Sequence, residues 1–331
     1  MLLKCVKPVL MTVLAVSAAV AHAQSVVGTI SLPGLPEQLA VNPFTNQIFV
    51  AVPNFGAEPF DYLTVIDGKA ETVLKNIEIP PVAYAVAVDS FSGLVYVGGS
   101  FVDSDGVTQS EVVVVEPQKS KVLTTISVST TTGNGIQGLA VNPLNGDLYV
   151  TNASDNEVDV IHCLKVKDRI STPGQPFGVA VNSLLDTAYV ALLDGSVSII
   201  NLKTNEITAT TPFGTSDAGI AVDLLNGNVF TTNSVGSPDA GSVGILNKTG
   251  TLESTVPAGN FPLGIDVDYF THLVFVANSG DNTVSVINEK TSAVTSTVPV
   301  SGLFLAVNPV TARVYVAPAI NSATLTVLSE K

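Results

Sequence analysis

Histidine, cysteine and acidic side chains are the groups in this sequence that could do chemistry, and they are few. Beyond the first 23 residues the histidines are His162 and His272, and the cysteine is Cys163. Nucleophilic catalysis needs a base within hydrogen-bond reach of the nucleophile. His162 and Cys163 are neighbours in a strand-like run, so their side chains should point to opposite sides, and neither histidine has an evident nucleophile partner. We therefore assign no catalytic residue, predict no cofactor and favour a non-enzymatic protein.

The loop Phe101–Glu111 is the other place where ligands gather in the sequence. Asp103, Asp105 and Glu111 offer hard oxygen ligands, and Gly106 permits a sharp bend. The loop lacks the third early acid of a full calcium-binding loop. We interpret it as a solvated acidic loop, with calcium binding as the alternative, and assign no metal ligand.

These groups must be positioned by a repeat that runs through the chain. A valine followed by Asn or Asp recurs every 40 to 53 residues, each time between an apolar run and a short polar turn. The seven pairs are Val41-Asn42, Val88-Asp89, Val141-Asn142, Val181-Asn182, Val222-Asp223, Val267-Asp268 and Val307-Asn308. We call this Asn or Asp the anchor residue, and we expect its side chain to cap its own turn.

Each repeat contains short runs rich in Val, Ile, Tyr and Phe, bounded by Gly, Pro, Asn and Asp, which is the pattern of β-strands. Three apolar runs are followed, in six repeats, by a fourth and more polar run; Ser25–Leu32, ahead of the first repeat, resembles the missing one. Strands that are apolar on both faces are buried on both sides, as in radially stacked sheets. The sequence thus predicts an all-β, seven-bladed β-propeller with four strands per blade, closed by an N-terminal strand that completes the last blade.

The first 23 residues have the pattern of an export signal. Lys4 and Lys7 precede an apolar stretch, and Ala21-His22-Ala23 is a small-x-small cleavage pattern, so we expect a signal peptide over 1–23. Residues 24–331 should then form one propeller domain, exported to the periplasm or secreted, with no membrane span. Loss of the leader removes two of the 14 basic residues and leaves all 28 acidic ones, a net charge of about −16. Such a charge disfavours nucleic acid and anionic membrane surfaces as partners.

Variable residues on the repeated frame mark the candidate binding site. Four residues before each anchor valine, where the first strand begins near the axial mouth, the repeats carry Glu37, Tyr84, Gln137, Phe177, Ala218, Leu263 and Leu303. One residue before the anchor valine, Asp266 replaces the alanine of the other six repeats, either as a filler of the channel or as a ligand contact. The frame has no need of this diversity. We therefore predict that Glu37, Tyr84, Gln137, Phe177 and Asp266 bind a protein or a small ligand.

Two phrases of the repeat carry a family resemblance. Leu148–Asn152 (LYVTN) and Val274–Asn288 (VFVANSGDNTVSVIN) resemble the YVTN-type repeat of YncE-like exported bacterial proteins and archaeal surface-layer proteins. The resemblance implies a seven-bladed propeller outside the cytoplasm and is nearly silent about chemistry.

Taken together, these patterns lead us to expect an exported, non-enzymatic binding scaffold that uses its axial mouth. Two alternatives stay open. One is a metal-dependent hydrolase or lyase, lactonase-like, with Glu37 and Asp266 as channel acids. The other is a cell-envelope or surface-layer structural module.

Overall fold

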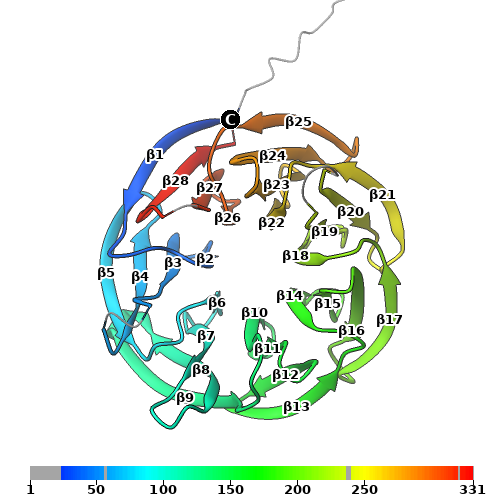
Figure 1. The fold of residues 1–331 in the computed structure, drawn as a ribbon. Coiled ribbons are helices and arrows are strands. Elements are labelled where there is room, and N and C mark those ends of the chain that lie inside the picture. Colours follow the sequence, from blue (N-terminus) through cyan, green and yellow to red (C-terminus); the bar gives the residue numbers. More distant parts are fainter. Residues whose placement is uncertain (1–23, 56–57, 236–239, 320, 331) are drawn as a thin grey trace, which may run out of the picture.

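Seven four-stranded antiparallel sheets stand around a central axis like the blades of a propeller (Figure 1). The structure is a computed structural model, and it describes residues 24–55, 58–235, 240–319 and 321–330. The signal peptide predicted over 1–23 lies outside these residues. Within each blade the strands run in order from the axis to the rim, so the first strand lines the centre and the fourth forms the outer edge.

The strands of the first four blades follow the chain without interruption. Blade 1 contains β2 (Leu39–Asn42), β3 (Gln47–Val52), β4 (Asp61–Asp67) and β5 (Thr72–Ile79). Blade 2 contains β6 (Ala85–Val88), β7 (Val95–Val102), β8 (Thr108–Glu116) and β9 (Lys121–Ser129), with a 3₁₀ turn, η1 (Pro117–Lys119), before β9. Blade 3 contains β10 (Ile136–Asn142), β11 (Asp147–Asn152), β12 (Glu157–His162) and β13 (Lys165–Ser171). Blade 4 contains β14 (Pro176–Asn182), β15 (Thr187–Leu192), β16 (Ser196–Asn201) and β17 (Glu206–Pro212).

The last three blades complete the ring. Blade 5 contains β18 (Asp217–Val222), β19 (Val229–Asn233), β20 (Ser242–Leu246) and β21 (Leu252–Pro257). Blade 6 contains β22 (Pro262–Asp268), β23 (Leu273–Asn278), β24 (Thr283–Asn288) and β25 (Ala293–Val298). Blade 7 contains β26 (Phe304–Asn308), β27 (Arg313–Ala317) and β28 (Thr324–Ser329), and its outer strand is β1 (Ser25–Ser31).

The pairing of β1 with β28 confirms the predicted closure of the ring. The two strands are antiparallel, from Ser25 opposite Ser329 to Ser31 opposite Thr324. Segments from the two ends of the chain therefore lie side by side in one sheet (Figure 1). In β1 the buried side chain is Ile30, which packs with Leu325 and Val327 in the core.

The hydrophobic core is divided among the seven boundaries between blades. Each of its seven clusters draws on two neighbouring blades, including the boundary where blade 7 meets blade 1. A large aromatic residue at the middle of every second strand is 5% exposed or less: Phe49, Tyr96, Tyr149, Tyr189, Phe230, Phe275 and Tyr315. Because each cluster lies between two sheets, the inner three strands must be apolar on both faces, as their sequences predicted.

The ring has two unlike faces. The loop face carries the loops between second and third strands and the links between blades. The hairpin face carries the hairpins between first and second strands (inner hairpins) and between third and fourth strands (outer hairpins). The outer hairpins of blades 1 to 6 are each followed by a bulge, a register shift that adds local twist where the fourth strand wraps the rim.

Candidate functional site

The five residues predicted to form the axial mouth line three cavities, two of which meet on the axis and share lining residues such as Gln38 and Leu39. Gln137 and Phe177 line a narrow cavity on the axis at the loop face. Glu37 and Tyr84 line another cavity of about 410 Å³ beside blades 1 and 2, together with Phe55 and Phe101. Asp266 lines the half of the axial channel that opens toward the hairpin face. Tyr84 also reaches the axis, because its ring packs edge-on against Phe304, which lines the same cavity as Gln137 and Phe177.

The lengths of the first strands explain why the predicted residues line different cavities. In blades 3 and 4 the first strand has seven residues and begins at or before the predicted position, so Gln137 and Phe177 stay on the axis. In blades 1 and 2 the first strand has only four residues, so Glu37 and Tyr84 belong to the link before it. Gln38, which sequence reasoning missed, spans the mouth: its Nε2 donates to the carbonyl oxygen of Gln137 at 2.7 Å. Burial raises the pKa of both Glu37 and Tyr84.

Asp266 uses both of its carboxylate oxygens on backbone groups. Oδ1 accepts the N–H of Val267 and Oδ2 accepts the N–H of Val307 in the next blade, each at 2.8 Å. Burial in the channel raises the pKa of Asp266 to about 6, against the lowering effect of these two hydrogen bonds. The carboxylate thus ties blade 6 to blade 7, as expected for a filler of the channel.

The acidic loop of blade 2 is organised by hydrogen bonds within itself. Asp103 accepts bonds from the Asp105 N–H, the Val107 N–H and Gln109 Nε2, and these bonds lower its pKa. Glu111 lies inside β8, opposite Gly99. Among the residues that the structure describes, the loop acids do not converge into a set of three ligand atoms.

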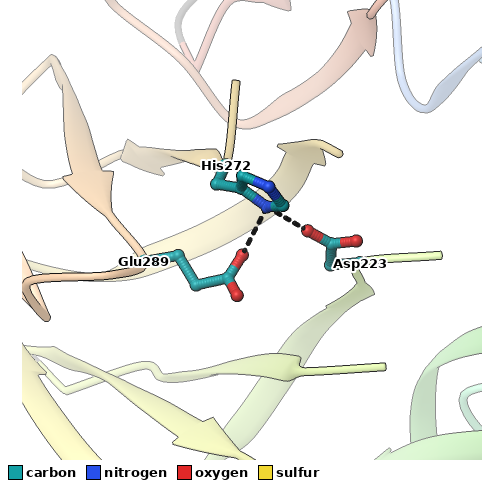
Figure 2. Close-up of side chains that lie close together, drawn as sticks. All are labelled: Asp223, His272 and Glu289. Carbon is teal, nitrogen blue, oxygen red and sulfur yellow. Dashed lines mark hydrogen bonds and ion pairs between the residues drawn. The ribbon is translucent and has the colours of Figure 1, made fainter. Parts of the chain in front are cut away.

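A different cluster forms where blade 5 meets blade 6 on the hairpin face (Figure 2). Asp223 is the anchor residue after β18, His272 ends the inner hairpin between β22 and β23, and Glu289 follows β24. His272 has a left-handed backbone, with φ 58°, at a hairpin position where Gly93, Gly146 and Gly227 stand in other blades. Histidine tolerates this conformation better than most residues. Antiparallel pairing of β23 with β24 then places Glu289 beside it.

The imidazole of His272 lies between the two carboxylates, which approach it from two sides (Figure 2). Its Nδ1 is 2.8 Å from Asp223 Oδ2 and 3.5 Å from Glu289 Oε2. The side chain of His272 is 22% exposed, whereas those of Asp223 and Glu289 are 0% and 4% exposed. Burial, followed by the charge of Asp223, raises the pKa of Glu289, while hydrogen bonds from Asn228 and Asn226 oppose that shift.

Sequence reasoning singled out His272 as a group that could do chemistry but missed its partners. Asp223 belongs to the neighbouring blade and comes into reach only through the ring geometry. His162 has a simpler environment, because its Nδ1 contacts a single carboxylate, Asp147 Oδ1, within its own blade. The sequence feature that could have indicated the cluster is a histidine at the left-handed hairpin position, combined with an acid after the third strand of the same blade.

A ring of apolar side chains stands on the hairpin face, one at the tip of every inner hairpin. Each of these tip residues comes two positions after the anchor and is between 60% and 67% exposed: Phe44, Phe91, Leu144, Leu184, Leu225, Phe270 and Val310. In all seven hairpins the anchor oxygen accepts the N–H of the tip residue, as predicted for a self-capping turn. The tips of blades 1 and 2 touch, since the Phe44 and Phe91 rings stack at 5.5 Å.

Charge is distributed unequally between the two faces. In the outer hairpins of the described chain, the exposed charged residues are lysines: Lys69, Lys119, Lys203, Lys248 and Lys290. Lys119 pairs with Glu116, and Lys203 pairs with Asp186. On the loop face, the described loops and links contain acids such as Glu58, Asp105, Asp194 and Asp281, and no lysine or arginine. The protein is therefore far less acidic on its hairpin face than its net charge suggests.

Comparison with known proteins supports the fold. No protein-family model matches the chain, and no curated protein matches it in sequence. Among solved structures, Kuenenia stuttgartiensis hydrazine synthase is similar, with a TM-score of 0.72 over 89% of this chain and 95% of that chain. At 17% sequence identity, this likeness shows the propeller fold alone. Within the described residues, no helix is long and apolar enough to cross a membrane.

Proposed function

We propose that this β-propeller is an exported, non-enzymatic scaffold that docks through its hairpin face on an anionic lipid surface. The observation that carries the proposal is the ring of seven tip residues, one large apolar side chain at the same exposed position in every blade. Export rests on the leader predicted over 1–23, and the proposed YVTN-type kinship rests on the repeat phrases of the sequence.

The chemistry of the tips favours a lipid surface as the occupant. Single exposed apolar residues are ordinary on protein surfaces, but seven at equivalent positions of one face form a pattern. Hairpin backbone N–H groups at the tips are already bonded to the anchor oxygens, so the tips have little polar capacity for directional recognition. Apolar tips at equivalent positions of one face suit the boundary between headgroups and acyl chains, which adapts to each of them.

The lysines of the outer hairpins select the charge of that surface. They surround the apolar ring and would face anionic headgroups, where a lysine without an acidic partner contributes about 1 kcal/mol. A second copy docked face to face would oppose lysine to lysine. Net charge alone predicted repulsion from anionic membranes, but the loop-face acids lie across the ring, and charges beyond about 8 to 10 Å are largely screened at physiological salt.

Vesicle flotation with the mature chain tests the proposal. We expect binding to vesicles that contain phosphatidylglycerol and weaker binding to pure phosphatidylcholine. The pair Phe44→Ser and Phe91→Ser should weaken binding at least about tenfold, since burying each ring contributes about 1.5 to 3 kcal/mol. The matched control is Phe55→Ser with Val102→Ser, two exposed apolar residues of the loop face.

Three outcomes would contradict the docking proposal. Wild-type protein that stays with neither vesicle overturns it, as does a tip variant that binds like the control. Concentration-dependent self-association that disappears in the tip variant would instead assign the face to a second copy, as the surface-layer alternative expects. The metal-dependent hydrolase alternative gains no support here, because Glu37 and Asp266 lie in different cavities.

A further inference from the structure

We propose that Asp223, His272 and Glu289 bind one divalent transition-metal ion, with Zn²⁺ as the probe, and that the ion clamps blade 5 to blade 6. One ligand atom from each residue lies within 4.8 Å of the others. In a tetrahedral zinc site with bonds of about 2.1 Å, neighbouring ligand atoms are roughly 3.4 Å apart. The distances from His272 Nδ1 to the two carboxylates, 2.8 and 3.5 Å, bracket that spacing.

The surrounding residues hold both carboxylates in a ligating orientation. Glu289 Oε1 accepts hydrogen bonds from Asn226 Nδ2 and Asn228 Nδ2, which leaves Oε2 directed at the imidazole (Figure 2). Asp223 Oδ1 accepts the N–H groups of Leu225 and Asn226, and Oδ2, which accepts a hydrogen bond from Asn226 Nδ2, faces the imidazole. Such outer contacts orient metal ligands and are part of most metal sites.

Glu289 brings a second buried carboxylate to the cluster. Asp223 Oδ2 already has two partners, Asn226 Nδ2 at 3.2 Å and His272 Nδ1 at 2.8 Å, so the anchor does not require a second acid. Yet Glu289 Oε2 is buried in the cluster with no hydrogen-bond partner. A buried carboxylate oxygen without a partner is costly. A metal ion coordinated by Oε2 removes that cost.

The other blade boundaries show that the frame does not need these groups. Where blade 7 meets blade 1, the side-chain amide of the anchor Asn308 donates to the side-chain amide of Asn46 at 2.6 Å, and both groups are neutral. Gly68 stands there at the position of Glu289. Where blade 6 meets blade 7, Asp268 and Glu330 supply two acids, but Ala312 replaces the histidine. Imidazole and two carboxylates coincide at the boundary of blades 5 and 6.

Donor type and charge identify the class of ion. Two carboxylates and one neutral imidazole carry a charge of −2, which a divalent cation balances, whereas a protonated His272 balances only half of it. Imidazole with carboxylate suits Zn²⁺ and its first-row neighbours, while Ca²⁺ takes six to eight oxygens. Binding through Nδ1 requires the single proton of the neutral imidazole to lie on Nε2, so His272 ligates the ion as a neutral ring.

Zinc titration of the mature, chelator-treated chain tests the site. The background should carry Cys163→Ser, because His162 and the exposed Cys163 could hold zinc adventitiously. We expect one Zn²⁺ per chain, a rise in melting temperature with Zn²⁺ and no comparable rise with Ca²⁺ or Mg²⁺. Bound Co²⁺ should give a visible absorption spectrum.

Matched variants make the assignment specific. His272→Asn keeps a residue that tolerates the left-handed backbone, and Glu289→Gln keeps the size of the side chain. Either change should weaken Zn²⁺ binding about 100-fold or more and abolish the Co²⁺ spectrum, whereas His162→Asn should change neither. Zinc held equally well by wild type and Glu289→Gln overturns the proposal, as does a wild-type chain that binds no zinc.

Discussion

At the scale of single residues, the anchor position shows how one atom decides the chemistry of a blade boundary. An anchor asparagine caps its turn with Oδ1 and donates from Nδ2 to the next blade, as Asn42 does to the carbonyl oxygen of Ser90. An aspartate can cap the turn but has no proton to donate. Asp223 Oδ2 therefore accepts a hydrogen bond from the Nδ1–H of His272. Asp268 lies beside Glu330, and Asp268 Oδ2 and Glu330 Oε1 are both buried without another partner.

A shared proton accounts for the state of Glu330. Burial, the hydrogen bond with Asp268 and the charge of Asp268 raise the pKa of Glu330 to about 9. In the unfolded chain the same carboxyl ionises near its ordinary value of 4.5. Between these values the folded protein binds more protons than the unfolded chain, so its stability falls as the pH rises from about 5 to about 9.

Glu330→Gln should remove this pH dependence. Glutamine keeps a neutral donor beside Asp268 at every pH. The variant should therefore be more stable than wild type near pH 9, and the difference in their free energies of unfolding should be smaller near pH 5. Urea unfolding across that range measures the effect, with the exposed Glu78→Gln as the control. Parallel pH profiles for wild type and Glu330→Gln would show that Glu330 is not the group responsible.

At the scale of the element, the propeller could be predicted because the composition of each strand indicates whether its two faces are buried or exposed. The inner strands are apolar on both faces, the outer strands are polar, and the anchors cap their turns as the repeat indicated. The starting points of the first strands could not be predicted, because they depend on how each link packs. That is why Glu37 and Tyr84 line a cavity beside blades 1 and 2 as well.

The proposed zinc site and the ring of tips could not be recognised from the sequence, for a different reason. Asp223 and Glu289 are far apart in the chain and meet only across a blade boundary. The tip residues were visible in the sequence as apolar residues in polar turns. Their exposure follows from the way the anchor holds each hairpin, which needed coordinates to recognise.

The closing strand gives a prediction at this scale. Ile30, 3% exposed, is the buried side chain of β1, whereas Val26 in the same strand is 47% exposed. Ile30→Ala should destabilise the protein by about 2 to 4 kcal/mol, and Val26→Ala by less than about 1 kcal/mol. Chemical denaturation of the two variants compares them directly. Equal and small losses would mean that β1 contributes little to the ring.

At the scale of the whole molecule, the charged residues are distributed unequally between the two faces, so the protein has a charge asymmetry along its axis. Lysines surround the apolar tips on the hairpin face, while acids occupy the loops of the opposite face. Solution measurements that report only net charge therefore describe neither face.

Charge reversal on each face separates net charge from its distribution. Lys248→Glu with Lys290→Glu should abolish the preference for anionic vesicles and its salt dependence, leaving the weak binding due to the tips. Glu58→Lys with Asp105→Lys changes the net charge by the same amount in the opposite sense and should alter binding little. If the loop-face pair strengthens binding as much as the lysine pair weakens it, net charge governs the interaction.

The pairing of β1 with β28 also sets an order of events in time. The strand of the propeller that is made first, β1, is paired with β28, which follows it by about 300 residues. Bringing such distant segments together costs on the order of 5 kcal/mol in loop-closure entropy, and contacts of this separation form slowly. The ring cannot be sealed before β28 has been made. Until β1 pairs with it, the outer edge of β28 is unpaired, so the propeller is vulnerable to misassembly until the ring closes.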